Sequence, residues 1–428
     1  MTDTVMYSNG HVRDPGPARP VPSVLVNHHT AAPVASGPIG EVARAALIAD
    51  GGPPAVHPAS IRVVRAPGRV NLIGEHTDYN GGFVLPAAIG LGIAIAYVPT
   101  DDRSVRLVLA ATGERAEVDL DAIGQRTGTW ADYVAGTAWA LTAAGLPLTG
   151  FRGALASDLP TGAGLSSSAA LELVTAWALA GARPPSPGPL DLARICQRAE
   201  NEYVGVQSGL MDQFASACGV AGSALFLDCR SLENRTVPIP DGLRLVVCHS
   251  GVTHQHGGGE YNTRRAECDR AVAALAALEG RPLGSLRDVD ADMLRRSGPR
   301  LDPVERRRAE HIVGENARVL ETEAALRTND LAAIRRLFAE SHASMRDLFE
   351  ITTPEMDTLV EIAVATPGVV AARMTGGGFG GCTINVVHPD GVSALRTAVE
   401  RDYAARTGRT PRLWEVEAAD GAGAVTVP

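Results

Sequence analysis

The sequence predicts an α+β protein of two domains. At 428 residues the chain is longer than one small core requires. Its expected strands and helices occur in clusters and not in the regular alternation of a parallel α/β fold. Pro238 and Pro240 bracket a turn before a strongly apolar strand, so the domain change is expected near 235–243. We expect a disordered tail over 1–38, an N-terminal domain over 39–240 and a C-terminal domain over 241–428.

The expected elements follow from apolar periodicity and from glycine and proline breaks. A short helix is expected at 41–49, followed by a strand that Pro67 and Gly68 end before Arg69. In the first half, strands are expected at 83–98, 105–109 and 151–156, and helices at 131–144, 168–180, 190–203 and 211–218. In the second half, strands are expected at 243–248, 369–374 and 383–387, and helices at about 260–279, 303–326 and 331–349.

Composition excludes several classes of protein. No run approaches the roughly 18 to 20 apolar residues of a membrane span, and the N-terminus lacks a signal-peptide pattern, so we expect a cytoplasmic protein without a membrane partner. The net charge of −9 argues against a nucleic-acid partner. The six cysteines form no Cys-x-x-Cys pair, which argues against a structural zinc site or a disulfide scaffold.

All 39 basic residues are arginines, so the chain contains no lysine. A Walker-type phosphate loop, a protein-kinase site, a Schiff-base enzyme and a pyridoxal-phosphate enzyme all require a lysine amine. Those four mechanisms are therefore excluded. Because the net charge is negative, any polyphosphate must be held by local donors and not by a global positive field.

A polar segment at 68–82 predicts a site for a polar ligand. It follows a short extended run and lies where a loop leaves a sheet, the usual place for binding chemistry. An ordinary turn beside Gly81 and Gly82 is the alternative, but a turn requires fewer hydrogen-bonding side chains. Six such side chains occur within this segment: Arg69, Asn71, Glu75, His76, Asp78 and Asn80.

The segment at 160–170 predicts a phosphate-binding loop. Gly162 and Gly164 would let the backbone approach an anion, and Ser166 to Ser168 add hydroxyl groups. The apolar helical pattern that follows would place unpaired N–H groups at the same point. A serine-capped helix without a ligand is the alternative.

Two further motifs carry weaker signals. Gly376, Gly378 and Gly381 formally match Gly-x-Gly-x-x-Gly, but the residues that follow alternate like a strand, which does not fit a dinucleotide site. A glycine-rich turn that presses against a ligand or the other domain is expected, with a simple hairpin as the alternative. Asp212 is expected in the first turn of a helix that begins near Gly209, where it could act chemically or only as a capping charge.

Together these segments resemble the GHMP small-molecule kinases and, within them, the galactokinase family. The resemblance extends from about residue 40 to the C-terminus. It covers the galactokinase signature at 66–86, the phosphate loop at 160–170, an acidic segment at 199–213 and the third glycine motif at 373–383. It implies a two-domain GHMP kinase fold, with a mixed-sheet N-terminal domain, an α+β C-terminal domain and the active site between them.

The resemblance implies ATP-dependent phosphorylation of D-galactose at its C1 hydroxyl, with magnesium, and we expect a monomer. Asp212 and Arg69 would be catalytic, with Asp212 either accepting the hydroxyl proton or holding the acceptor in line electrostatically. The sugar would contact Glu75, His76, Asp78, Gly209, Asp212 and Tyr261. The nucleotide would contact Gly162, Ala163, Gly164, Leu165, Ser166, Ser167, Ser168 and Ala169, with Trp130 and Tyr133 beside the adenine. Magnesium would be held by Ser168 and Glu200, with Ser167 as an alternative to Ser168.

Two departures from the family pattern leave this chemistry untouched: Phe349 replaces a frequent tyrosine, and the loop at 254–259 is unusually rich in glycine. A kinase for N-acetylgalactosamine or arabinose is an alternative within the enzyme class. A non-catalytic galactose and ATP sensor is an alternative from another class, although the complete phosphate loop and Asp212 argue against it.

Overall fold

The computed structural model describes residues 34–35, 38–50, 60–160, 162–183, 188–252 and 259–426. Most of the expected tail at 1–38, and residues 254–258 of the glycine-rich loop, therefore lie outside the described residues. The part of the expected tail at Val34–Ala35 forms a strand. The residues in the described part form one seven-stranded, one four-stranded and one three-stranded sheet with their covering helices.

The seven-stranded sheet is mixed and has the order β1-β14-β2-β4-β7-β5-β6. Only the β1–β14 and β5–β7 pairs are parallel. Its strands in chain order are β1 (Val34–Ala35), β2 (Arg62–Asn71), β4 (Pro86–Pro99), β5 (Ser104–Leu109), β6 (Arg115–Asp119), β7 (Phe151–Ser157) and β14 (Gly423–Thr426). The sheet thus joins the first and last strands of the described chain.

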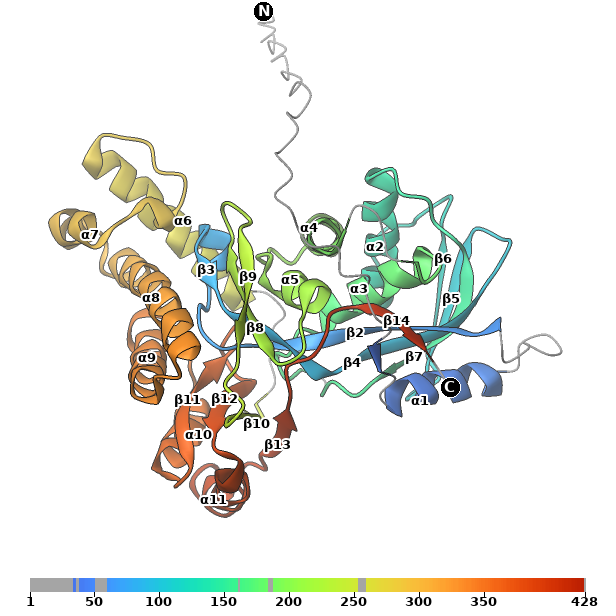
Figure 1. The fold of residues 1–428 in the computed structure, drawn as a ribbon. Helices are drawn as coiled ribbons and strands as arrows, with labels where there is room; N and C mark the ends of the chain where they lie inside the picture. The colour runs from blue at the N-terminus through green and yellow to red at the C-terminus, as the bar shows by residue number, and fades with distance from the viewer. Residues whose placement is uncertain are drawn as a thin grey trace, which may run out of the picture. The chain divides into compact units, whose positions relative to one another are not determined.

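The two faces of this sheet follow from the alternation of side chains along each strand. On β4, Ile93 and Ile95 enter the main core, whereas Ala94 and Ala96 enter a smaller core with α1 (Pro38–Ala49). Small alanines let α1 approach one face closely. The other face packs against α3 (Ser167–Leu179) and α5 (Met211–Cys218), with α2 (Ala131–Ala143) and α4 (Pro189–Arg198) beside them, and Figure 1 shows α1 and α3 on opposite sides.

The four-stranded sheet is antiparallel and has the order β11-β12-β10-β13. Its strands are β10 (Arg244–His249), β11 (Val369–Thr375), β12 (Cys382–Val387) and β13 (Arg412–Val416). Val246, Leu359 and Tyr403 belong to the core that joins one face to α10 (Pro354–Ala365) and α11 (Val392–Thr407). The opposite face enters the main core, so this sheet and the first share one apolar interior.

The remaining helices and strands include those that pack around the polar segment at 68–82. They are α6 (Gly259–Glu279), α7 (Ala291–Ser297), α8 (Pro303–Thr328), α9 (Leu331–Ser344) and the small sheet β3-β8-β9 (Phe83–Val84, Ser223–Asp228 and Asn234–Pro238). Short 3-10 turns occur at Asp78–Asn80, Leu286–Asp288, Gly298–Arg300 and Pro389–Gly391. α8 contacts β3 and β9, and β3 is the strand that directly follows the segment at 68–82.

Two sequence predictions for strands were wrong, and two for helices were only partly correct. The strand predicted to end before Arg69 continues to Asn71, because Pro67 and Gly68 form an irregularity in the β2–β4 pairing and do not terminate the strand. The strand predicted at 83–98 is divided: β3 pairs with β8, and β4 pairs with β2. The helices predicted at 190–203 and 331–349 both end in π-helical turns, at Ala199–Val204 and Met345–Phe349.

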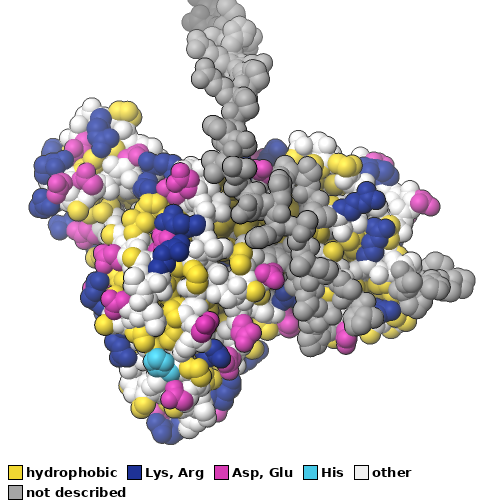
Figure 2. All heavy atoms as spheres, viewed as in Figure 1, with side chains coloured by type: hydrophobic (Ala, Val, Ile, Leu, Met, Phe, Trp, Pro, Cys, Tyr) yellow, Lys and Arg dark blue, Asp and Glu magenta, His cyan; other side chains and the backbone are white. Residues whose placement is uncertain are grey.

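Among the described residues, no helix is long and apolar enough to cross a bilayer. On the face drawn in Figure 2, basic and acidic side chains are interspersed, and every basic one is an arginine. The visible face therefore presents no broad field of one sign that would attract a polyanion.

Candidate active site

A pocket of about 330 Å³ lies where the four sequence motifs meet. Fourteen of the predicted site residues line it: Arg69, Glu75, His76, Asp78, Gly162, Gly164, Leu165, Ser166, Ser167, Ser168, Glu200, Gly209, Asp212 and Tyr261. Gly376 and Gly377 of the third glycine motif line it too. Segments that are distant in sequence thus form one cavity, and it is the candidate active site.

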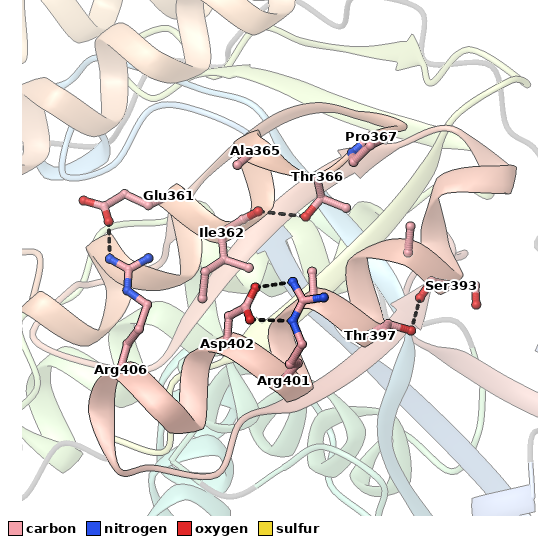
Figure 3. Close-up of a pocket in the computed structure, with 12 residues that line it drawn as sticks. Glu361, Ile362, Ala365, Thr366, Pro367, Ser393, Thr397, Arg401, Asp402 and Arg406 are labelled. Atoms are coloured by element: carbon pink, nitrogen blue, oxygen red, sulfur yellow. Dashed lines mark hydrogen bonds and ion pairs between the residues drawn. The ribbon is translucent and has the colours of Figure 1, made fainter.

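A second hollow lies between α10 and α11 (Figure 3). Its polar groups bond to one another: Arg401 pairs with Asp402, and Arg406 pairs with Glu361. The Thr366 and Thr397 hydroxyls donate to carbonyls of their own helices. No predicted site residue lines this hollow, and its paired charges offer little to a polar ligand.

Arg69 and Asp212 form a two-bond ion pair at the centre of the candidate site. The Nε of Arg69 lies 2.8 Å from Oδ1 of Asp212, and its Nη2 lies 2.9 Å from Oδ2. Nη1 donates to the Gly164 carbonyl at 2.6 Å, so the same guanidinium contacts the phosphate loop. A planar guanidinium with two parallel bonds fixes the direction of the carboxylate as well as its charge.

The bulge in β2 explains why Arg69 reaches this position. A side chain at Gly68 would clash with the Leu165 carbonyl, so glycine permits β2 to lie against the phosphate loop. The Arg69 amide donates to that carbonyl at 3.1 Å. The local irregularity therefore brings the sugar segment and the phosphate loop together.

The phosphate loop leaves the start of α3 available to an anion. Gly162 and Gly164 have positive φ angles of 70° and 71°, which favour glycine. Ser166 precedes α3, but its hydroxyl donates to Oδ2 of Asp212 at 2.6 Å and does not cap the helix. Ser167 and Ser168, in the first turn, line the pocket. First-turn N–H groups and the helix dipole favour a phosphate there.

Asp78, Gly209 and Tyr261 meet on the other side of Asp212. A side chain at Gly209 would clash with the Asp78 carboxylate, so the backbone and the carboxylate are in direct contact. Tyr261 hydrogen-bonds to the backbone of Gly209. Burial, and then the Asp212 charge, raises the pKa of Asp78 to about 6. This side offers acceptors and donors at short spacing, as a polyhydroxyl ligand requires.

Glu75 and His76 bond mainly to the third glycine motif. Glu75 is buried, pairs with Nη2 of Arg373 and accepts from the Gly376 amide at 3.2 Å. Burial raises the pKa of Glu75, and Arg373 opposes that shift. Nε2 of His76 lies 3.1 Å from the Gly377 carbonyl. Both residues thus connect the polar segment at 68–82 to the turn between β11 and β12.

The tautomer of His76 follows from its surroundings. Burial lowers its pKa to about 3, so the ring is neutral at pH 7. The Gly377 carbonyl can only accept, so Nε2 carries the proton and donates. Nδ1 then accepts from the Tyr79 hydroxyl, 2.8 Å away. The His76 ring also packs against Tyr261 and Phe349, at centroid distances of 4.9 and 4.8 Å.

Four predicted nucleotide residues do not line the pocket. Trp130 and Tyr133 pack, partly buried, against the main core at the start of α2. Burial, and then the charge of Glu200, raises the pKa of Tyr133 to about 12. Ala163 and Ala169 are buried, and the Ala163 carbonyl lies against Gly381. These two alanines support the loop from within.

Glu200 and Ser168 form a site that fits a magnesium ion. Glu200 is buried and accepts hydrogen bonds from Ser208, Gln213 and Ser168. No arginine pairs with it in the described part of the chain. No cluster of three or more His, Cys, Asp or Glu side chains suited to a metal occurs among the described residues. One carboxylate and one hydroxyl suit magnesium, which takes its remaining oxygens from phosphates and water.

Family models match three parts of the chain. The galactokinase galactose-binding signature matches residues 56–99, the GHMP kinases N terminal domain matches 132–220, and the GHMP kinases C terminal model matches 322–405. The galactokinase of Chloroflexus aggregans is 45% identical over 350 residues, 82% of this chain and 90% of that protein. The chain belongs to the galactokinase family.

Other proteins similar to this galactokinase-family chain support the same family assignment. The galactokinase of Streptomyces coelicolor is 45% identical over 370 residues, 83% of this chain and 92% of that protein. The structure of Lactococcus lactis galactokinase complexed with galactose has a TM-score of 0.81 and 35% identity over 85% of this chain and 94% of that one. A mevalonate kinase structure, with a TM-score of 0.58 at 18% identity, shares the fold. The predicted GHMP kinase fold is confirmed.

Several residues of the site in this galactokinase-family chain have no role that the sequence predicts. Arg373 lies in the third glycine motif, but its bond to Glu75 joins positions about 300 residues apart. Gln213 follows Asp212 and bonds to Glu172 and Glu200. Glu172 did carry a signal, because it is a charged residue within the apolar pattern of a helix. Its full burial confirms that it faces the interior.

Proposed function

We propose that this chain transfers the γ-phosphoryl group of ATP to the C1 hydroxyl of D-galactose. The products would be ADP and galactose 1-phosphate. This reaction would be the first committed step of galactose catabolism. One observation carries the proposal: the Arg69–Asp212 pair lies between a helix N-terminus that suits phosphates and the polar group of Asp78, Gly209 and Tyr261. Membership of the galactokinase family supports the choice of sugar and of ATP as co-substrate.

In this proposal Asp212 orients the acceptor hydroxyl and takes its proton. A bond forms between the sugar oxygen and the γ-phosphorus while the bond from that phosphorus to the β–γ bridging oxygen breaks. Phosphoryl transfer of this kind requires mainly placement and neutralisation of charge. Arg69, which already contacts both Asp212 and the phosphate loop, would stabilise charge on the transferred group.

Magnesium would lie at Ser168 and Glu200 and would neutralise charge on the phosphate oxygens. The lack of lysine is compatible with this arrangement, because helix N–H groups, Arg69 and a metal replace a lysine amine. Tyr133, whose pKa is affected by Glu200, would then lie on the nucleotide side of the pocket. A cytoplasmic location and a monomeric state stay predictions from the sequence.

We also propose that residues 39–240 and 241–428 are the two kinase domains, with β1 of the expected tail at the edge of the first sheet. The four strands of the second sheet all follow residue 241, which supports this division. The last strand, β14, also follows residue 241 but pairs with β2. The C-terminal domain would therefore contribute one strand to the first sheet.

A sugar panel in an ADP-release assay tests the proposed activity. Galactose should be phosphorylated far faster than glucose, its 4-epimer, because a site that hydrogen-bonds particular hydroxyls can reject an analogue by roughly 10⁴-fold. Faster turnover with N-acetylgalactosamine, arabinose, glucose or mevalonate would contradict the choice of substrate. Binding of galactose and ATP without any turnover would instead support a sensor.

Asp212→Ala is the matched variant for the same assay. Loss of a group that orients and deprotonates the acceptor should lower kcat by at least about 10³-fold. Galactose binding should remain measurable by calorimetry, because Asp78, Gly209 and Tyr261 are retained. Turnover near that of the wild type would show that Asp212 has no catalytic role.

A further inference from the structure

Two buried carboxylates meet at one amide group behind the candidate site. Nε2 of Gln213 lies 3.0 Å from Oε2 of Glu172 and 2.8 Å from Oε2 of Glu200. All three side chains are at most 4% exposed. Two amide hydrogens on one nitrogen can serve two acceptors, so Gln213 holds both carboxylates at a fixed separation.

Helix α5 also connects Gln213 to Asp212 through the backbone. Asp212 and Gln213 are consecutive in its first turn, but their side chains have different partners. Asp212 bonds to Arg69 and Ser166, whereas Gln213 bonds to Glu172 and Glu200. A rotation or shift of this turn would therefore move the candidate catalytic carboxylate and the candidate metal carboxylate together.

Gln213 and Ser208 restrict the rotation of Glu200. Both donate to its Oε2, which leaves Oε1 outside that pair of bonds. Glu200 lies on a π-helical turn and lines the pocket near Ser168. A carboxylate held through one oxygen can present the other in a constant direction, as metal sites commonly require.

Glu172 is costly as a purely structural residue. It lies between Leu171 and Leu173 on α3, and within the described chain no arginine or histidine pairs with it. Its Oε1 has no hydrogen-bond partner among the described residues. An apolar residue would fill this position without the penalty of burying a carboxyl group. Its bond to Gln213 is the feature that an apolar residue could not supply.

We propose that Gln213, held in place by Glu172, is a positioning residue that directs the Glu200 carboxylate toward the divalent cation that accompanies the nucleotide. Glu172 fixes the plane of the Gln213 amide, and the amide fixes Glu200. The inference rests on the proposed kinase function only for the presence of that cation. Neither Gln213 nor Glu172 is among the residues that line the candidate pocket.

Binding of Mn²⁺ to the complex with ADP, measured by electron paramagnetic resonance, tests the inference without turnover. Gln213→Met removes both donors at similar volume and should weaken Mn²⁺ binding about 10- to 100-fold, the usual effect of losing a partner of a metal ligand. Galactose affinity, measured by calorimetry, should change less than about twofold, because the sugar side is separate. Gln207→Met, an exposed glutamine on the nearby loop, is the control and should match the wild type.

Two variants of Glu172 separate positioning from packing. Glu172→Leu removes the acceptor and should weaken Mn²⁺ binding about tenfold, whereas Glu172→Gln keeps an acceptor for Gln213 and should weaken it no more than about threefold. If Gln213→Met does not fold, Gln213→Asn withdraws the amide by one methylene, and a weaker Mn²⁺ complex with unchanged galactose affinity is again required.

Unchanged Mn²⁺ affinity in Gln213→Met, or equal losses of Mn²⁺ and galactose affinity, would overturn the inference. Equal losses in Glu172→Gln and Glu172→Leu would overturn the role of Glu172. The proposed function fails separately, if the wild-type chain phosphorylates no sugar, because the Mn²⁺ measurement requires only ADP.

Discussion

At the scale of single residues, the site is defined by what donates to each carboxylate. Asp212 receives two bonds from Arg69 and one from Ser166. Glu75 receives its bonds from Arg373 and the Gly376 amide. Asp78 has backbone donors but no arginine in its hydrogen bonds, and it lies near the Asp212 charge. The ionised form of Asp78 is therefore disfavoured by burial and by that charge, without an arginine bonded to it.

Replacing Asp78 should make stability depend less on pH. Burial and Asp212 raise the pKa of Asp78 to about 6 in the folded state, from 3.8. Its contribution to stability is therefore complete below about pH 4 and is lost as pH rises through 6. Asp78→Asn should gain about 1 to 2 kcal/mol relative to the wild type between pH 4.5 and 7.5. Urea unfolding at both pH values measures this difference.

The exposed Asp269 on α6 provides the control for that experiment, and Asp269→Asn should show no such trend. A free-energy difference between Asp78→Asn and the wild type that stays constant with pH would contradict the prediction. The same variant should bind galactose more weakly, since an amide cannot replace every hydrogen bond that a carboxylate accepts.

At the scale of elements, three irregular positions bring the candidate site together. The bulge in β2 lets Arg69 reach the phosphate loop. α3 begins without a side-chain cap, and α5 begins directly after Gly209 and Leu210. Regular strands and helices support these points from the core, so the functional groups lie where regular structure begins or is interrupted.

Gly209→Ala should weaken galactose binding without unfolding the protein. The added methyl group would clash with the Asp78 carboxylate, which must move from its place in the pocket wall. We expect the calorimetric Kd for galactose to rise at least about tenfold, equivalent to one or two lost hydrogen bonds. Gly242→Ala is the control, because nothing lies within 4 Å of the added carbon. Equal affinities in the two variants would refute this assignment.

At the scale of the whole molecule, contacts between distant segments create the pocket. Its lining residues run from Arg69 to Phe379. The last strand, β14, lies between β1 and β2 in the first sheet. The segment before β14 also contacts β4 and α5, because the Ala419 amide donates to the Ala88 carbonyl and the Ala422 amide donates to the Ser216 carbonyl. The chain end thus supports the sheet that carries Arg69.

Ending the chain after residue 422 should destabilise it while leaving the pocket residues in place. The truncation removes β14, including buried Val425, and exposes the edge of β2. We expect the Tm to fall by at least about 5 °C and aggregation to increase, with galactose affinity of the folded fraction within about threefold of wild type. Removing only residues 427–428 keeps β14 and is the control. The same Tm for both truncations would show that β14 does not support the sheet.

The sequence by itself determined the α+β class, most long helices and the segments that carry the site. Burial follows local periodicity, so α3, α5, α6 and α8 were predictable within a few residues. Glycines and polar side chains that a strand or helix does not require predicted that 68–82, 160–170 and Asp212 belong to the site. The lack of lysine narrowed the chemistry further.

Only the tertiary structure decided which partners these residues have. Glu75 and His76 had the pattern of sugar ligands, yet they bond to Arg373, Gly376 and Gly377, about 300 residues away. Pro67 and Gly68 predicted a strand end but form a bulge, because pairing with β4 continues on both sides. Sequence pattern encodes which face of an element is buried. Sheet order and register decide what that face meets, and they depend on the packing of the whole chain.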